Sequence, residues 1–188
     1  MKSSTTRLLP LLLLLGSAAA VTPLDLWARQ QTTCPQLHVL GARETTSPQG
    51  FGTSQAVVDL VIKAFPGTTS EAIVYPAAGG PAYASSVTDG IAAVINQTQT
   101  FARQCPGSRM VLVGYSQGGQ IMDDAFCGGP DGQSLVMGSI PMPSDVGAMV
   151  AAMIWMGNPR FAPGLAYNAG TAKLGGVSGF AQPLVALY

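Results

Sequence analysis

Ser116 is the residue of this sequence best suited to act as a nucleophile. It stands in the segment Gly114-Tyr115-Ser116-Gln117-Gly118, which matches the pattern G-x-S-x-G. In a chain with 23 glycines the match alone is a weak signal, so its position has to add weight. An apolar run precedes Ser116 and a helix-like segment follows it, and a sharp strand-to-helix turn exposes a serine hydroxyl at the edge of a sheet. The flanking glycines favour so tight a turn, and the first amides of the helix would stabilise a developing oxyanion. The alternative is an ordinary glycine-rich turn.

A serine nucleophile needs a base to accept its proton and a carboxylate to orient that base. The sequence contains one histidine, His38, which lies far upstream of Ser116 inside an expected strand. We interpret His38 as a structural residue, because serine, acid and histidine follow one another in that order in proteins built around such an elbow. Four aspartates follow Ser116, and without a histidine none completes a triad: Asp123, Asp124, Asp131 and Asp145. We expect Asp123 and Asp124 to be solvated or to cap the helix.

Strand-like and helix-like segments alternate along the chain, which indicates an α/β domain with a mostly parallel sheet. The expected strands are 37–40, ended by Gly41, then 71–75, 109–115 and a buried strand at 150–156. The expected helices are one capped by Ser54 with its apolar face formed by Val57, Val58, Val61, Ile62 and Phe65, then 83–103 and 117–126. A loop rich in glycine, proline and serine follows at 128–144.

The composition limits the possible partners. The net charge is zero, only 10% of residues are charged and 47% are hydrophobic, which indicates one well-buried domain. No basic run could hold a nucleic acid, and no segment is long and apolar enough to span a membrane. We therefore expect an uncharged substrate or one recognised by shape. No metal-ligand spacing and no dinucleotide-binding glycine pattern occurs, so no metal or other cofactor is expected.

The N-terminus has the pattern of a signal peptide over residues 1–20: Lys2 and Arg7 precede an apolar stretch at 8–15, and small residues follow at 17–20. Residues 21–33 are interpreted as a pro-segment or flexible lead-in, and 34–188 as the folded domain. The protein is thus predicted to be secreted and extracellular. Asn96-Gln97-Thr98 is a glycosylation sequon, although Asn96 could equally be an unmodified helix residue.

Export permits disulfides, and the domain holds three cysteines, Cys34, Cys105 and Cys127. One of them must stay unpaired within the chain. An odd number suggests either an intermolecular bond or a missing partner.

Several motifs together resemble the fungal acetylxylan esterase and cutinase family, carbohydrate esterase family 5. They are Cys34-Pro35, His38-Val39, the segment from Gly41 to Thr46, the elbow and Gly157-Asn158-Pro159. The segment Gly-Ala-Arg-Glu-Thr-Thr favours the acetylxylan esterase branch. The resemblance implies a three-layer, lidless α/β-hydrolase fold and a secreted serine esterase acting on acetylated plant cell-wall polysaccharide or cutin-like esters, active as a monomer.

The resemblance also implies roles for particular residues. Ser116 would be the nucleophile, and the Gln117 N–H with Thr45 would form the oxyanion hole. Thr45 follows a strand expected beside the central one, so it can reach the same sheet edge as Ser116, although it could instead only cap or turn its loop. Cys34 and Cys105 match the family's disulfide, which would leave Cys127 free. We assign no catalysis to Arg43 or Glu44.

The sequence departs from the family pattern after about Gly170. Family members continue there with the catalytic aspartate, the histidine, more cysteines and a last strand, and Asn158 stands where aspartate is usual. We expect a truncated chain that lacks this strand, whose residues 157–188 are poorly ordered. The competing hypotheses are an ester hydrolase, a catalytically silent secreted binding or effector protein, and an interaction module with an accidental elbow.

Overall fold

A computed structural model describes residues 34–128 and 139–176, which belong to a compact unit that begins at Cys34. The predicted signal peptide (1–20) and pro-segment (21–33) lie outside the described residues, as do Asp131 and residues 177–188.

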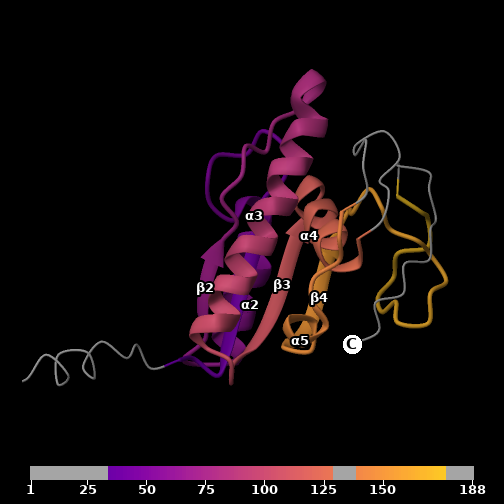
Figure 1. Cartoon of the computed structure of the whole chain (residues 1–188). Helices are drawn as coiled ribbons and strands as arrows, with labels where there is room; N and C mark the ends of the chain where they lie inside the picture. The colour runs from indigo at the N-terminus through magenta and orange to yellow at the C-terminus, as the bar shows by residue number, and fades with distance from the viewer. Residues whose placement is uncertain (1–33, 129–138, 177–188) are drawn as a thin grey trace, which may run out of the picture. The chain divides into compact units, whose positions relative to one another are not determined.

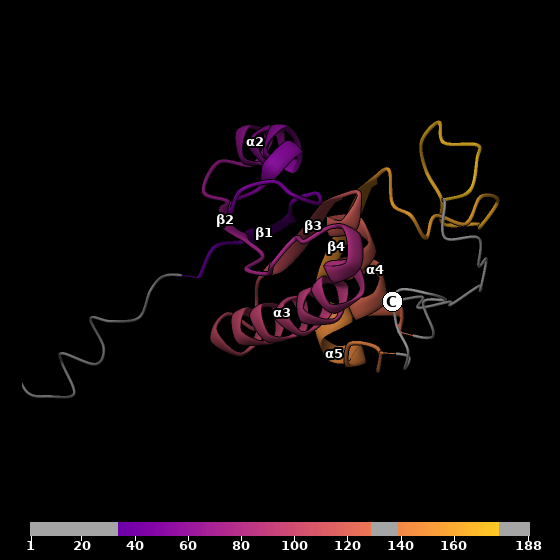
Figure 2. The ribbon, with the colours of Figure 1, turned by 90° about the horizontal axis from the view of Figure 1, so that it is seen from above.

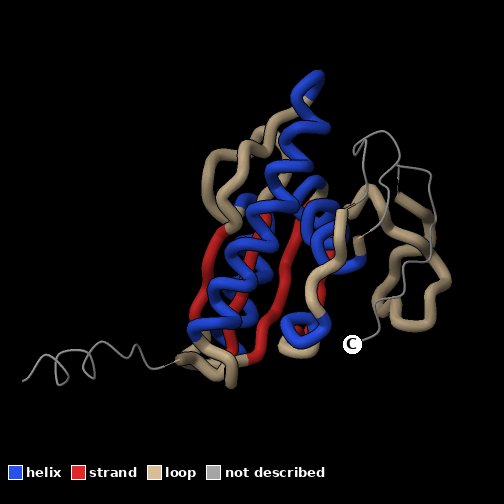
Figure 3. The backbone as a smooth tube through the Cα atoms, viewed as in Figure 1, coloured by secondary structure: helices blue, strands red, loops and turns tan. Residues whose placement is uncertain are grey.

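Four parallel strands form one sheet in the described part of the chain (Figure 1). They are β1 (Leu37–Ala42), β2 (Thr69–Ala72), β3 (Arg109–Tyr115) and β4 (Val150–Met156), in the order β2-β1-β3-β4. Helices separate successive strands and return the chain to the same end of the sheet, which makes the pairing parallel (Figure 3). The prediction of a parallel α/β sheet is confirmed. Because β3 lies between β1 and β4, its apolar run is buried.

Helices cover both faces of this sheet (Figure 2). Helix α2 (Gln55–Ala64) lies on one face, and α3 (Tyr83–Gln104) and α4 (Gln117–Cys127) lie on the other; α5 (Ser144–Gly147) is a single short turn. Two 3₁₀ turns, Gly52–Ser54 and Gly80–Ala82, precede α2 and α3. The three-layer arrangement is therefore as predicted. None of the described helices combines the length and apolar character needed to cross a membrane.

Strand side chains alternate between the two helical layers, as the pleat requires. Val39, Val111 and Val113 pack with Val58 of α2 in one buried cluster. The residues between them, Leu40 and Leu112 among them, pack under α3 and α4 in the larger cluster. The two cores hold β1 and β3 rigidly at the centre of the sheet.

The first two strands differ from their predicted bounds. Gly41 does not end β1: a Cβ there would lie 2.4 Å from the Phe51 ring, so the glycine makes room for packing within the strand. Strand β2 ends at Ala72 instead of Tyr75. The Arg43 side chain, from the loop after β1, donates hydrogen bonds to the carbonyls of Ile73 and Tyr75. The chain leaves the sheet at these residues because their carbonyls bond Arg43.

Three further expectations need correction. Ser54 precedes α2 but does not cap it, since its hydroxyl donates to the Ala42 carbonyl at 2.9 Å. Phe65 lies beyond the end of α2 and is 58% exposed. Strand β4 has its predicted bounds, but residues 151–153 are exposed because β4 is the outermost strand of the described sheet. The predicted loop at 128–144 is described only at its ends, and α5 begins at its last residue.

Candidate functional site

Ser116 occupies a sharp turn between β3 and α4, with φ 52° and ψ −120°. This left-handed conformation is uncommon for a residue with a side chain and persists only where the surroundings enforce it. Two backbone bonds do so: the Ser116 N–H donates to the Met156 carbonyl at 2.8 Å, and the Ser116 carbonyl accepts from the Gln120 N–H at 3.1 Å. The chain thus has the strained strand-to-helix geometry that the motif predicts.

The two glycines of the motif are required by close packing. A Cβ at Gly114 would lie 2.6 Å from the backbone of Gly119, and a Cβ at Gly118 would lie 2.3 Å from the Ala42 carbonyl oxygen. Helix α4 therefore begins in direct backbone contact with the end of β1. That contact brings the loop after β1 to the elbow.

Thr45 and Gln117 lie at the same sheet edge as Ser116. Ala42, the last residue of β1, pairs with Gly114, so Thr45 follows the ladder by three residues and Ser116 by two. Gln117 opens α4, where the first amides have no intrahelical acceptor and point out of the helix end. The register and the helix start thus place Gln117 and the turn of Thr45 at the same sheet edge as Ser116.

The turning role in the loop after β1 falls to Thr46. Thr46 has φ 64°, its hydroxyl donates to the Thr45 carbonyl at 2.7 Å, and its N–H donates to the Ala77 carbonyl at 2.7 Å. Among the described residues, the Thr45 hydroxyl makes no hydrogen bond. The geometry is compatible with an oxyanion-binding role for Thr45.

Arg43 is a buried support for this loop, which the sequence did not reveal. Its guanidinium donates to the Ser47 carbonyl at 2.9 Å and lies 4.7 Å from the centre of the Tyr75 ring. The Tyr75 hydroxyl donates back to the Arg43 carbonyl at 2.6 Å, and burial raises the pKa of this phenol, which keeps it a donor. Glu44 accepts bonds from the N–H and hydroxyl of Thr53, so neither charged residue is directed to catalysis.

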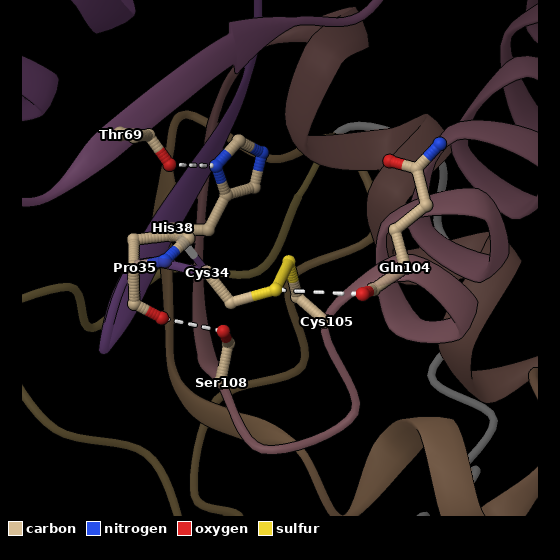
Figure 4. Close-up of a disulfide and its surroundings, with 7 residues drawn as sticks. All are labelled: Cys34, Pro35, His38, Thr69, Gln104, Cys105 and Ser108. Atoms are coloured by element: carbon tan, nitrogen blue, oxygen red, sulfur yellow. Dashed lines mark hydrogen bonds between the residues drawn. A yellow bond between two sulfur atoms is a disulfide. The ribbon is translucent and has the colours of Figure 1, made fainter. Parts of the chain in front are cut away.

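His38 lies at the opposite end of the sheet from Ser116. It pairs with Met110, six residues before Ser116, a separation of roughly 20 Å at about 3.3 Å per residue. Its Nδ1 bonds the Thr69 hydroxyl at 2.7 Å (Figure 4). Its ring stacks on the Phe101 ring, with the two centres 4.0 Å apart. Burial lowers the pKa of His38, and the Glu71 carboxylate, 3.8 Å from Nε2, partly opposes this shift. The structural interpretation of His38 fits this position.

Asp123 and Asp124 are not solvated caps. Asp124 is fully buried and pairs with the Arg160 guanidinium. Asn158 donates to the Asp123 carboxylate at 2.8 Å and accepts the Arg160 N–H at 3.0 Å. An ionised aspartate at position 158 could not donate to Asp123, so asparagine suits this network. Asp123 and Asp124 lie more than 30 residues from Asn158 and Arg160, so no local pattern could have indicated that these residues meet.

Cys34 and Cys105 form a disulfide, which ties the start of β1 to the end of α3 (Figure 4). Cys127 is free. Burial, followed by the neighbouring Asp123 charge, raises the pKa of its thiol to about 12. The predicted pairing is confirmed, and the raised pKa favours the protonated form of the Cys127 thiol.

Asn96 is exposed on α3, whereas Thr98, the hydroxyl residue of the sequon, is fully buried. A glycosylating enzyme could therefore recognise this sequon only before the domain folds. Among the described residues no cluster of three or more histidine, cysteine or acidic side chains could hold a metal ion.

A cavity of about 900 Å³ lies along β4 and the segment after it, between residues such as Met153, Trp155 and Tyr167. Ser116, Thr45 and Gln117 do not line it. These three residues are thus separate from the lining of this cavity.

The chain is similar to known esterases. The Cutinase family profile matches residues 33–181. Acetylxylan esterase 2 from Talaromyces purpureogenus is 47% identical over 184 residues, which cover 92% of this chain and 78% of the relative. Acetylxylan esterase from Hypocrea jecorina is 47% identical over 180 residues, and the chain spans only 60% of that relative's length. A solved acetylxylan esterase structure matches with a TM-score of 0.73 at 47% identity, over 81% of this chain and 79% of that one. These matches confirm the resemblance that the motifs indicate.

Proposed function

Because this chain belongs to the cutinase family, we propose that it is a carboxylic-ester hydrolase of the acetylxylan esterase type, with Ser116 as its nucleophile. The observation that carries the proposal is the left-handed backbone of Ser116 at the junction of β3 and α4. The proposed substrate is acetylated plant cell-wall polysaccharide, with cutin-like esters as the related class. The names of the relatives support the first choice.

In the proposed reaction the Ser116 hydroxyl attacks the ester carbonyl. The Gln117 N–H and Thr45 stabilise the oxyanion, the alcohol leaves, and water then releases the acid from the acyl-serine. Solvent water accepts the serine proton and protonates the departing alcohol, because His38, the one histidine of this sequence, lies roughly 20 Å away by the strand spacing. We therefore expect hydrolysis by these 188 residues to run several orders of magnitude below that of a histidine-assisted serine esterase.

Export is part of the same proposal. The N-terminal pattern of residues 1–20 predicts a signal peptide, and the Cys34–Cys105 disulfide suits an oxidising compartment. These two features support an extracellular protein that acts on a polymer outside the cell.

A catalytically silent ester-binding protein is the second candidate. The burial of His38 between Thr69 and Phe101 favours it, since this histidine cannot swing toward Ser116 without breaking the core. Such a protein would bind acetylated oligosaccharide without forming an acyl-serine.

Acylation of Ser116 by p-nitrophenyl acetate, followed by mass spectrometry of the quenched protein, separates the two candidates. An esterase site gives slow acetylation of Ser116 that disappears in Ser116→Ala and persists in Ser85→Ala, which removes an exposed serine of α3. Added imidazole should accelerate turnover in the unmodified protein more than in Ser116→Ala. Binding of acetylated xylo-oligosaccharide by calorimetry without any acetylation would favour the silent protein and overturn the esterase proposal.

A further inference from the structure

The side chain of Gln117 forms a closed ring of hydrogen bonds with a loop on the far side of the elbow. Gln117 is fully buried, and its Oε1 accepts from the Ser86 hydroxyl at 3.1 Å. Its Nε2 donates to the Ala78 carbonyl at 3.1 Å. The Ala78 N–H in turn donates to the Ser86 Oγ at 2.9 Å, which closes the ring. Each donor therefore has an acceptor within the ring, and the position of loop 77–79 is set by the residue that follows the nucleophile.

The same loop contacts the turn that carries Thr45. The Ala77 carbonyl accepts the Thr46 N–H at 2.7 Å, and a Cβ at Gly79 would lie 3.0 Å from the Thr45 methyl carbon. Loop 77–79 thus lies between the Gln117 side chain and the Thr45–Thr46 turn. A displacement of the loop would move Thr45 relative to the elbow.

The backbone of this loop does not hold its conformation unaided. Ala77 has φ 51°, in the left-handed region that residues with a side chain rarely adopt. Such conformations persist where the surrounding contacts enforce them, and here those contacts are the Gln117 ring on one side and Thr46 on the other. Without the ring, loop 77–79 should relax toward ordinary backbone angles.

We propose that the Gln117 side chain is a positioning residue that holds Thr45, through loop 77–79, at the oxyanion site beside Gln117's own N–H. The inference rests on the proposed function of Ser116 and adds to it. One residue would supply an oxyanion donor from its backbone and place the second contributor with its side chain. The ring thereby couples the two halves of the oxyanion hole, which the chain draws from β1 and α4.

The test compares Gln117→Met, which keeps the side-chain length and removes both amide bonds, with the unmodified protein. We expect faster hydrogen exchange at the Thr46 and Ala78 amides. We also expect slower acetylation of Ser116, by up to the roughly 10²-fold that removal of one oxyanion donor costs. Ser86→Ala breaks the same ring, so the double variant should lose little more than either single variant.

Gln97→Met is the matched control. Gln97 is also a helical glutamine tied to the chain after β2, since it accepts the Val74 N–H at 2.9 Å and donates to the Ala72 carbonyl at 3.2 Å. The Gln97→Met substitution should lower the free energy of unfolding without changing the rate of Ser116 acetylation or the hydrogen exchange of the Thr46 amide. Unchanged Thr46 exchange in Gln117→Met would overturn the inference whatever the activity. Absence of acetylation in the unmodified protein would instead count against the proposed function alone.

Discussion

The two ends of the sheet are built differently. At the carboxyl ends of the strands lie Thr46, Ala77 and Ser116, and these are the only residues other than glycine with a left-handed backbone among residues 34–128 and 139–176. They are also connected, because Thr46 bonds Ala77 and the loop of Ala77 bonds the residue after Ser116. Backbone strain is thus concentrated at the end of the sheet where the chemistry is proposed.

The amino ends of the strands are held by a disulfide, a hydrogen bond and a stacked ring pair instead of being strained. Cys34 is bonded to Cys105, and the Ser108 hydroxyl donates to the Pro35 carbonyl at 2.5 Å (Figure 4). His38 stacks on Phe101. None of these groups lies near Ser116. The contrast indicates that the amino ends of the strands secure the fold, while the carboxyl ends hold a strained backbone. Four experiments test the contribution of particular residues to this difference.

Loss of the disulfide should have the largest effect on stability. Replacing Cys34 and Cys105 by serine releases a loop of 71 residues, which costs about 4 kcal/mol of unfolding free energy in the chain-entropy model. Urea denaturation measures the loss. If the two ends are independent, the rate of Ser116 acetylation per folded molecule should stay unchanged, and a parallel fall in that rate would refute the separation.

Gly118→Ala should have the next largest effect and lower the free energy of unfolding by about 3 kcal/mol. Its Cβ would lie 2.3 Å from the Ala42 carbonyl oxygen and would force α4 away from β1. Gly107→Ala is the matched change at the other end, where no atom lies within 4 Å of the new Cβ. We expect Gly107→Ala to be nearly neutral by thermal denaturation, and only Gly118→Ala to slow acetylation of Ser116. Equal effects of the two substitutions would remove the distinction between the ends.

The buried His38, at the amino ends of the strands, should make the stability of the fold depend on pH. Burial lowers the pKa of folded His38 below the usual 6.5, so the unfolded chain binds a proton more readily than the folded one. The contribution of neutral His38 to the free energy of unfolding is complete above pH 6.5. It is lost as the pH falls from 6.5 toward the lower pKa of the folded protein. Urea midpoints measured across this range should decline less steeply in His38→Gln. A decline of the same slope in both proteins would contradict the assignment.

The smallest expected change is at Thr98, in the last two turns of α3. The Thr98 hydroxyl is buried without a hydrogen-bond partner in the described structure, so Thr98→Val should stabilise the fold by about 1 kcal/mol. The comparison requires protein made without glycosylation, because the change also destroys the sequon of Asn96. Asn96→Gln, which removes only the sequon, should leave the urea midpoint unchanged, and a loss of stability in Thr98→Val would show that the hydroxyl is satisfied.

Much of the framework could be predicted from the sequence. The bounds of β3 and β4 follow from continuous apolar runs, and the start of α4 follows from the G-x-S-x-G pattern, because these signals lie in neighbouring residues. Only for β3 does the run also reflect burial at the centre of the sheet. The same local signals indicated that Ser116 would stand at a strand-to-helix junction. The family motifs added the Cys34–Cys105 pairing.

Only the tertiary structure decided the contacts between segments that are far apart in the chain. Arg43 ends β2 early by taking the carbonyls of Ile73 and Tyr75, and Asp124 is buried against Arg160, 36 residues away. The Gln117 ring likewise joins residues 31 and 39 positions apart. Periodicity indicates which face of a helix or strand is apolar, but it contains no information on which polar group across the fold will satisfy a buried side chain. That choice is made by the packing of separate elements: β1 beside β2 brings Arg43 to the carbonyls after β2, and α4 beside α3 brings Gln117 to Ser86.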